Sequence, residues 1–149
     1  MIVFRISSNR YAGKLQASGM TARWNYGKQK VLYTSESRAL ACVENIAHRS
    51  MTGLSGLFKT QVIMIPDHLK IKIIDENNLP PGWLKPEQYP FCQEVGASWF
   101  VSAKSPVLRV PSALIPKEHN YILHMNHPDF KLIKLLDIEE FNFDPRLKM

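Results

Sequence analysis

Hydrophobic and polar positions along the chain predict seven strands and two helices. Short apolar or β-branched runs, some with alternating polarity, are typical of strands. The runs that predict strands are 2–6, 31–34, 58–65, 69–74, 107–110, 121–125 and 132–138. Amphipathic spacing predicts one helix over 36–49, with Ser35 as its N-cap, and a second over 90–103, in which Gly96 is unfavourable.

These elements predict a single α+β domain over residues 1–149. The strands outnumber the helices and do not alternate evenly with them, which is typical of that class. A chain of 149 residues, 45% of them hydrophobic, is long enough to bury a core. Its apolar runs are too short for a signal peptide or a membrane span, and Cys42 and Cys92 form no disulfide framework, so we expect a cytoplasmic protein.

The first predicted helix places a carboxylate beside its apolar face. At about 100° per residue one side of the helix collects five apolar residues, and Glu44 falls at its edge. The five are Ala39, Leu40, Val43, Ile46 and Ala47. A carboxylate at such a boundary can face a ligand and keep its charge. The alternative is an ordinary boundary glutamate paired with a nearby Lys or Arg.

Positive charge is concentrated in the first 60 residues, which hold nine Lys and Arg against two acids, while the remainder holds ten against eleven. This asymmetry predicts an anionic partner for the N-terminal part, although a solvated basic surface gives the same counts. Arg5 and Arg23 are candidates to clamp a phosphate through the planar guanidinium. Zinc-finger, RRM and helix-turn-helix patterns are absent from the sequence, so nucleic-acid binding is a weaker interpretation.

Two further side chains are candidates for ligand contact, each with a structural alternative. Tyr33 ends a predicted strand and either offers its ring to a planar heterocycle or packs in the core. Ser112 directly follows a strand and Pro111, so its hydroxyl has a fixed direction, as it also has in many turns. Gly-rich phosphate loops and hydrolase motifs are absent. His124 and His127 fit a turn better than a metal site.

Ordered segments across nearly the whole chain resemble the RES-domain family, bacterial toxins named for shared arginine, glutamate and serine positions. The segments are 4–5, 22–27, 31–35, 39–44, Trp99, 110–113, 120–121, 126–130 and 143–147. Thr21-Ala22 stands where many members have Gly-Gly, and residues 124–126 also depart from the common pattern. Neither departure removes a candidate group.

The resemblance implies a fold similar to the ADP-ribosyltransferase toxins, with a split, bent sheet, flanking helices and a cleft for NAD. It implies a toxin that degrades NAD at the nicotinamide–ribose bond by phosphorolysis or hydrolysis, with no cofactor, no metal, and inorganic phosphate as an optional co-substrate. ADP-ribosyl transfer to a host protein is the alternative reaction. The implied partner is an Xre-type antitoxin that covers the cleft and binds DNA for the complex, in which the toxin can be a homodimer.

The resemblance assigns catalysis to Glu44, Arg23 and Ser112, and binding of NAD to these three together with Arg5 and Tyr33. Glu44 is expected to stabilise positive charge on the ribose, and the two arginines to hold the pyrophosphate. Tyr33 is expected to pack on nicotinamide or its ribose, and Ser112 to orient the leaving group. An alternative hypothesis of a different functional class is that the chain is a non-catalytic interaction module. It predicts no NAD turnover and no growth arrest.

Overall fold

The computed structural model describes residues 1–48 and 57–147, and in this part of the chain seven strands form one mixed sheet. The strands are β1 (Ile2–Ser8), β2 (Val31–Ser35), β3 (Phe58–Met64), β4 (Ile71–Ile73), β5 (Val107–Pro111), β6 (His119–His124) and β7 (Lys134–Phe141). Their order is β4-β5-β6-β2-β1-β3-β7. The pair β4–β5 is parallel and the others are antiparallel.

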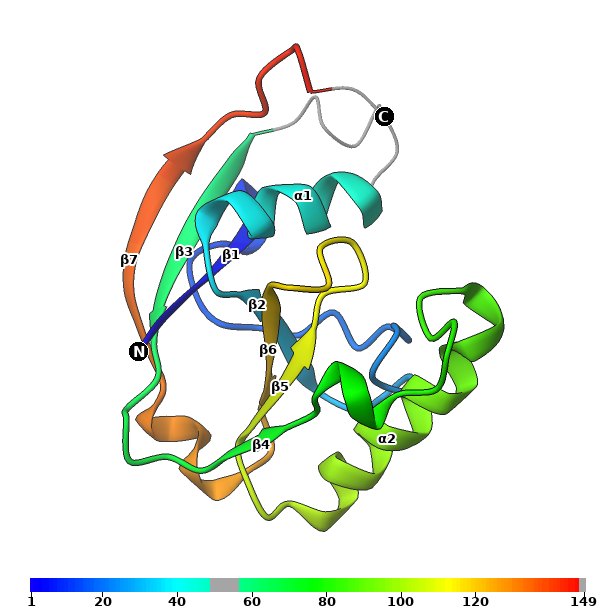
Figure 1. Ribbon diagram of the computed structural model, residues 1–149. Coiled ribbons are helices and arrows are strands. Elements are labelled where there is room, and N and C mark those ends of the chain that lie inside the picture. Colours follow the sequence, from blue (N-terminus) through cyan, green and yellow to red (C-terminus); the bar gives the residue numbers. More distant parts are fainter. Residues whose placement is uncertain (49–56, 148–149) are drawn as a thin grey trace.

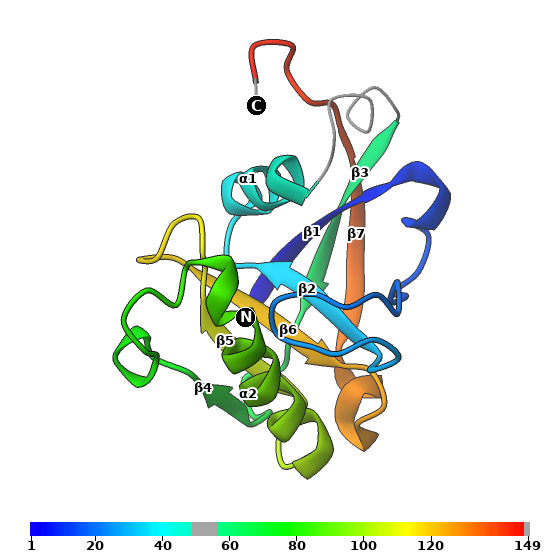
Figure 2. The ribbon, with the colours of Figure 1, turned by 90° about the vertical axis from the view of Figure 1, so that its right-hand side faces the viewer.

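In the described part of the chain, two α-helices flank this sheet, α1 (Arg38–His48) and α2 (Tyr89–Ser102). Figures 1 and 2 show α1 beside β1 and β2, and α2 beside β4 and β5, so the helices cover different parts of the sheet. The remaining elements of residues 1–48 and 57–147 are 3-10 turns at Asn9–Tyr11, Glu76–Asn78, Pro86–Gln88 and Pro128–Leu132. The predicted α+β class is confirmed.

The sheet is split between β1 and β2. These strands are in register at one pair, Phe4 with Ser35, whereas β1 pairs with β3 along its whole length. One half is therefore β4-β5-β6-β2 and the other is β1-β3-β7. Helix α1 contacts β1 and β2 and so lies at the join. A ligand group carried by α1 is thus placed where the two halves of the sheet meet.

Among the residues that the structure describes, three apolar clusters hold these layers together. Trp99 and Cys92 of α2 pack with Leu108 of β5 and Ile122 of β6. Ala41 of α1 belongs to a smaller cluster at the other half of the sheet, together with Ile6, Phe58, Phe141 and Phe143. The opposite face of the sheet carries a third cluster, which includes Val3, Leu32, Ile63, Val107 and Leu123. Because α1 and α2 pack in separate clusters, the sheet surface between them is free to carry polar groups.

Helix α1 begins later than predicted and its cap is another serine. Ser37, not Ser35, accepts the backbone N–H of Leu40 through its hydroxyl at 3.0 Å, which makes it the N-cap. Ser35 is the last residue of β2, where its hydroxyl donates to Asn120 Oδ1 at 2.7 Å. The predicted end of the helix, Arg49, lies outside the described residues. Strand β7 also begins later than predicted, because residues up to Leu132 form a 3-10 turn.

The buried face of α1 is also different from the predicted one. Leu40 and Ala41 are buried, whereas Val43 is 38% exposed and Ala39 and Ala47 are exposed. The helix is rotated so that Glu44 faces inward, to partners on β6 and the 112–115 turn. The buried face of this short helix is therefore rotated relative to the predicted apolar face, and Glu44 lies within the inward-facing side rather than at its edge.

Candidate active site

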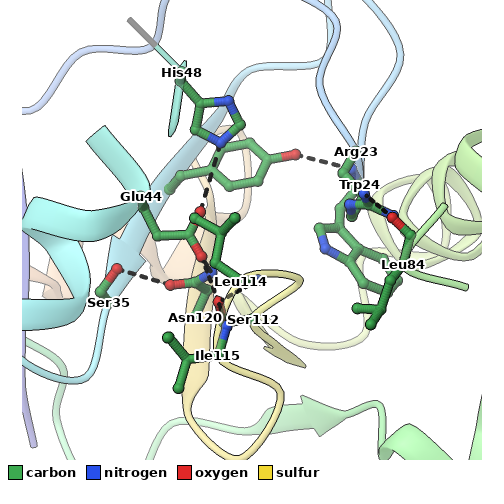
Figure 3. A network of polar contacts seen from close by, with 11 residues as sticks. Arg23, Trp24, Ser35, Glu44, His48, Leu84, Ser112, Leu114, Ile115 and Asn120 are labelled. Atoms are coloured by element: carbon green, nitrogen blue, oxygen red, sulfur yellow. Dashed lines mark hydrogen bonds and ion pairs between the residues drawn. The ribbon is translucent and has the colours of Figure 1, made fainter. Parts of the chain in front are cut away.

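The Glu44 side chain is the centre of a polar network that joins three elements (Figure 3). Its Oε1 atom accepts a hydrogen bond from Ser112 Oγ and another from Asn120 Nδ2, both at 2.7 Å. Its Oε2 atom lies 3.5 Å from Nε2 of His48, one helical turn further along α1. The Glu44 side chain remains 19% exposed, so solvent and a ligand can reach the carboxylate.

Ser112 has one hydroxyl proton, and the surrounding contacts fix where it goes. The backbone N–H groups of Leu114 and Ile115 both donate to Ser112 Oγ at 3.1 Å. The hydroxyl therefore accepts twice and must give its proton to the carboxylate of Glu44, which can only accept. In this structure the hydroxyl of Ser112 donates to Glu44. The predicted hydrogen bond from Ser112 to a leaving group therefore requires the hydroxyl to turn away from Glu44 first.

The network keeps Glu44 ionised. Burial raises the pKa of Glu44, but contacts with His48, Ser112 and Asn120 favour the carboxylate and together lower the pKa below its ordinary value. Short hydrogen bonds to a charged acceptor are stronger than those between neutral groups. The site therefore presents a fixed negative charge at neutral pH, which suits stabilisation of a cation.

Tyr33 is fixed by its hydroxyl to the segment that carries Arg23. The hydroxyl accepts the backbone N–H of Trp24 at 3.0 Å and donates to Asn25 Oδ1 at 2.7 Å. Burial raises the pKa of Tyr33, so the phenol is neutral. Its ring belongs to the apolar cluster under α2. Tyr33 is thus partly buried against the core, and a ligand contact, which stays a prediction, would come from the part of the ring left exposed.

Arg23 is engaged with the segment that follows β4. Its two terminal nitrogens donate to the backbone carbonyls of Trp83 at 2.8 Å and Leu84 at 3.1 Å. The guanidinium carbon lies 4.3 Å from the centre of the Tyr89 ring. Figure 3 shows Arg23 with Trp24 and Leu84 in a group apart from the Glu44 network. Arg23 can clamp a phosphate with both terminal nitrogens only by exchanging these carbonyls for phosphate oxygens.

The described hydrogen bond of Arg5 is made outside the Glu44 network. Its Nη1 atom donates to Gln61 Oε1 at 3.3 Å, and Gln61 is fully buried. Neighbouring residues of a strand point to opposite faces, so Arg5 projects away from the face of Phe4 and its paired residue Ser35. That face carries the Glu44 network. The structure therefore does not bring Arg5 and Arg23 together in one phosphate clamp, as the sequence predicted.

The charge imbalance along the sequence is partly compensated in space. Arg38 forms a salt bridge with Glu139 of β7 at 2.7 Å, and Lys59 forms another with Glu140 of the same strand. Two of the N-terminal basic residues are thus neutralised by acidic residues from the C-terminal part. The excess positive charge in the first 60 residues is therefore weaker evidence for an anion site in the folded structure than the residue counts alone suggest.

Two cavities of the described residues lie away from the Glu44 network. A cavity of about 560 Å³ lies between α2 and β4, and another of about 350 Å³ is lined by residues from 68–70, 104–106 and 129–132. Neither contains Glu44, Ser112 or Arg23. Residues 1–48 and 57–147 hold no group of three or more His, Cys, Asp or Glu side chains arranged to bind a metal. In the same ranges no helix has the length and apolar character needed to cross a membrane.

The comparison of the sequence with known families matches the RES domain over residues 2–144. The chain belongs to the RES-domain family. A RES relative from Photorhabdus laumondii, named Toxin Res, is 33% identical over 99% of this chain and 97% of its own length. Another from Sphingobium, named Prs ADP-ribosylating toxin, is 32% identical over 84% of this chain and 79% of its own.

The RES fold is also found in a solved structure. A chain of the M. tuberculosis MbcT–MbcA toxin–antitoxin complex matches with a TM-score of 0.77, covering 95% of this chain and 84% of that chain. The sequence identity is 15%, so this match shows the fold alone. The predicted split sheet with flanking helices is the arrangement observed here, and the neighbour shares this overall fold.

Two contacts of Glu44 in this RES domain were missed by reasoning from the sequence. Asn120 falls in a segment that resembles the family, but an asparagine near the start of a strand has no chemical signal until β6 is paired with β2. His48 lies four residues after Glu44, a spacing that places two side chains on the same face of a helix. That spacing was readable in the sequence.

Proposed function

We propose that this RES domain is the toxin of a toxin–antitoxin pair and cleaves the nicotinamide–ribose bond of NAD. The observation that carries the proposal is the Glu44 carboxylate, which is held ionised, has one oxygen occupied by two donors and remains reachable through the other. RES relatives that are named as toxins support the toxin assignment. The reaction fits a fixed anion because bond cleavage creates a cation at the ribose.

In the proposed reaction the bond between the ribose carbon and the nicotinamide nitrogen breaks, and nicotinamide leaves with the electron pair as a neutral molecule. The ribose develops oxocarbenium character, as in glycoside cleavage. Glu44 Oε2 stabilises this positive charge and binds ribose hydroxyls. Water then adds at the same carbon and releases a proton, giving ADP-ribose. Inorganic phosphate in place of water gives ADP-ribose phosphate.

Arg23 and Tyr33 complete the proposed substrate site. Arg23 would exchange the carbonyls of Trp83 and Leu84 for oxygens of the pyrophosphate, and its stacking on Tyr89 keeps the guanidinium in place during the exchange. Tyr33 would contact nicotinamide or the adjoining ribose with its ring. Arg5 has no part in this proposal because it lies on the opposite face of the sheet.

An antitoxin is the proposed protein partner. Apolar side chains surround the Glu44 network at the surface, since Val43, Leu114 and Ile115 are 38%, 41% and 38% exposed. A partner that packs on them would exclude NAD from Glu44. The MbcT–MbcA neighbour is a toxin–antitoxin complex, which supports a partner of this kind. An Xre-type antitoxin is the class that we expect, with DNA bound through that partner.

Product analysis tests the proposed reaction. Purified protein is incubated with NAD with and without inorganic phosphate, and nicotinamide, ADP-ribose and ADP-ribose phosphate are separated by chromatography. We expect release of nicotinamide, and a requirement for phosphate identifies phosphorolysis. An Asn142→Ala variant, altered at an exposed position after β7, serves as the matched control and should behave like the wild type. Absence of nicotinamide release under all these conditions would contradict the proposal.

ADP-ribosyl transfer to a protein is the second candidate. It is favoured by the name of the Sphingobium relative, Prs ADP-ribosylating toxin. The first steps are the same, but a protein side chain replaces water as the acceptor. Incubation of the protein with NAD labelled in the adenine moiety and a cell extract distinguishes the two reactions. Label that stays bound to protein after denaturation supports transfer, and label found only in small molecules supports degradation.

A further inference from the structure

We infer that Asn120, itself held by Ser35, is a positioning residue that fixes the Glu44 carboxylate so that Oε2 faces the ribose. This inference rests on the proposed function for its last step, because it assigns a task in NAD cleavage. Its structural part, that the Ser35–Asn120 pair orients Glu44, can be tested without substrate. Neither residue was among the site residues predicted from the sequence.

The protons along this chain of residues have only one arrangement. An ionised carboxylate accepts but does not donate, so the side-chain NH₂ of Asn120 must face Glu44, where the distance is 2.7 Å. The amide oxygen of Asn120 then faces Ser35. That oxygen also only accepts, so the Ser35 hydroxyl must donate to it, at 2.7 Å. The carboxylate of Glu44 therefore decides which way the Asn120 amide faces, and the Ser35 hydroxyl supports that orientation by donating to the amide oxygen.

The pairing of the sheet makes this arrangement rigid. Ser35 and Asn120 are directly opposite each other in the β2–β6 ladder, so their side chains leave the same face. Ser35 is 4% exposed, which leaves its side chain little room for another rotamer. Asn120 therefore reaches Glu44 from the sheet, while Ser112 reaches it from the turn after β5. Two elements thus fix a side chain that belongs to a third, the helix α1.

The two oxygens of Glu44 consequently have different tasks. Oε1 receives both short hydrogen bonds, so both of its lone pairs are occupied. Oε2 has the longer contact of 3.5 Å with His48, whose side chain is 66% exposed and easily displaced. A ligand can therefore replace His48 at Oε2 without disturbing Oε1. Without Asn120 the carboxylate should be able to rotate, so that Oε1 and Oε2 exchange positions and neither is held toward the ligand.

Titration of the Glu44 carboxyl by NMR tests the structural part without NAD. Protein labelled with ¹³C at glutamate side chains is titrated, and the Glu44 signal is assigned with the Glu44→Gln variant. Loss of a donor disfavours the carboxylate, so Asn120→Ala should raise the pKa of Glu44 and Ser35→Ala should raise it less. Asn120→Asp keeps the shape and adds a second carboxyl, so its increase should be the largest. Asn142→Ala is the control and should leave the Glu44 titration unchanged.

The contribution of His48 must be separated from this effect, since its side chain lies on α1 beside Oε2. Ser112 and Asn120 are uncharged, and His119, next to Asn120, contacts Glu36 at 3.2 Å instead. The titration is therefore repeated in a His48→Gln background. The increase caused by Asn120→Ala should persist there. A Glu44 pKa that is the same with and without Asn120 would overturn the inference.

Turnover tests the catalytic part. One hydrogen bond to a charged group is lost, so Asn120→Ala should lower kcat for NAD by about tenfold to a hundredfold with a smaller change in KM. The acid limb of its pH–rate profile should move to higher pH, which general loss of folded protein would not cause. An unchanged kcat would refute the positioning role. A wild type without NAD turnover would instead refute the proposed function, and the NMR titration would still decide whether Asn120 orients Glu44.

Discussion

Replacing Gly96 by alanine should destabilise this RES domain, although alanine is the better helix former. A Cβ atom added at Gly96 in α2 would lie 1.6 Å from the carbonyl oxygen of Trp24 and 2.6 Å from its carbonyl carbon. Both are backbone atoms, so no rotation of a side chain relieves the contact. The helix and the Trp24 segment must separate until the closest distance exceeds 3.0 Å.

The magnitude follows from two opposing effects. Alanine gains about 1 kcal/mol over glycine in helix propensity. Overpacking a filled site costs about 1–3 kcal/mol and more when the backbone itself must move. We therefore expect Gly96→Ala to lower the free energy of unfolding by about 2 kcal/mol. The same displacement moves Arg23, the neighbour of Trp24, so NAD turnover should also fall.

Urea denaturation monitored by tryptophan fluorescence measures this loss, because Trp24, Trp83 and Trp99 all belong to the cluster under α2. With a slope of about 2 kcal/mol per molar urea, the midpoint should fall by about 1 M. Gly13→Ala is the matched control, since a Cβ there meets no atom within 4 Å, and it should change stability by less than about 0.5 kcal/mol. A Gly96→Ala midpoint equal to or above that of the wild type would refute the reasoning.

Three further predictions concern the site itself. Tyr33→Phe leaves the Trp24 N–H and the Asn25 side-chain oxygen without their partner, so urea midpoints should show a loss of about 1–3 kcal/mol, and equal midpoints would contradict that role. Arg23→Ala should weaken NAD binding in calorimetry and lower the rate, and unchanged binding would remove Arg23 from the phosphate site. The pKa of Glu44 is lowered in the folded protein, so its ionised form stabilises the fold. This stabilisation is present above the pKa of the unfolded chain, about 4.3, and is lost as pH falls through the pKa of the folded protein. The excess stability of the wild type over Glu44→Gln should therefore shrink between pH 6 and pH 3, and an excess that grows over that range would count against the assigned ionisation.

Most of the fold could be predicted because strands and helices leave periodic patterns in the sequence. All seven predicted strands overlap observed ones. The rotation of α1 could not be predicted from hydrophobicity, since Glu44 and Asn45 point inward to hydrogen-bond partners far away in the sequence. The capping serine was ambiguous for a similar reason. Ser35 and Ser37 have the same local chemistry, and only the pairing of Ser35 with Asn120 assigns the cap to Ser37.

The site was predictable residue by residue but not as an arrangement. Glu44 and Ser112 are 68 positions apart, and their contact depends on the placement of the β5–β6 turn beside α1. Arg5 was a reasonable phosphate ligand by residue type. Its position on the far face follows from the register of β1, which the short run 2–6 does not specify. Similarly, Arg23 looks free in the sequence but is engaged by carbonyls about 60 residues away.

The most direct test of the central claim is the rate of nicotinamide release from NAD by the wild type and by Glu44→Gln at neutral pH. Glutamine removes the charge, yet its amide oxygen can still accept from Ser112 and Asn120, so the fold and the network should remain. Circular dichroism and the urea midpoint verify that the variant is folded. We predict that its rate falls by about 10²–10³. Equal rates of nicotinamide release in the two proteins would contradict the assignment of Glu44 as the group that stabilises the ribose cation.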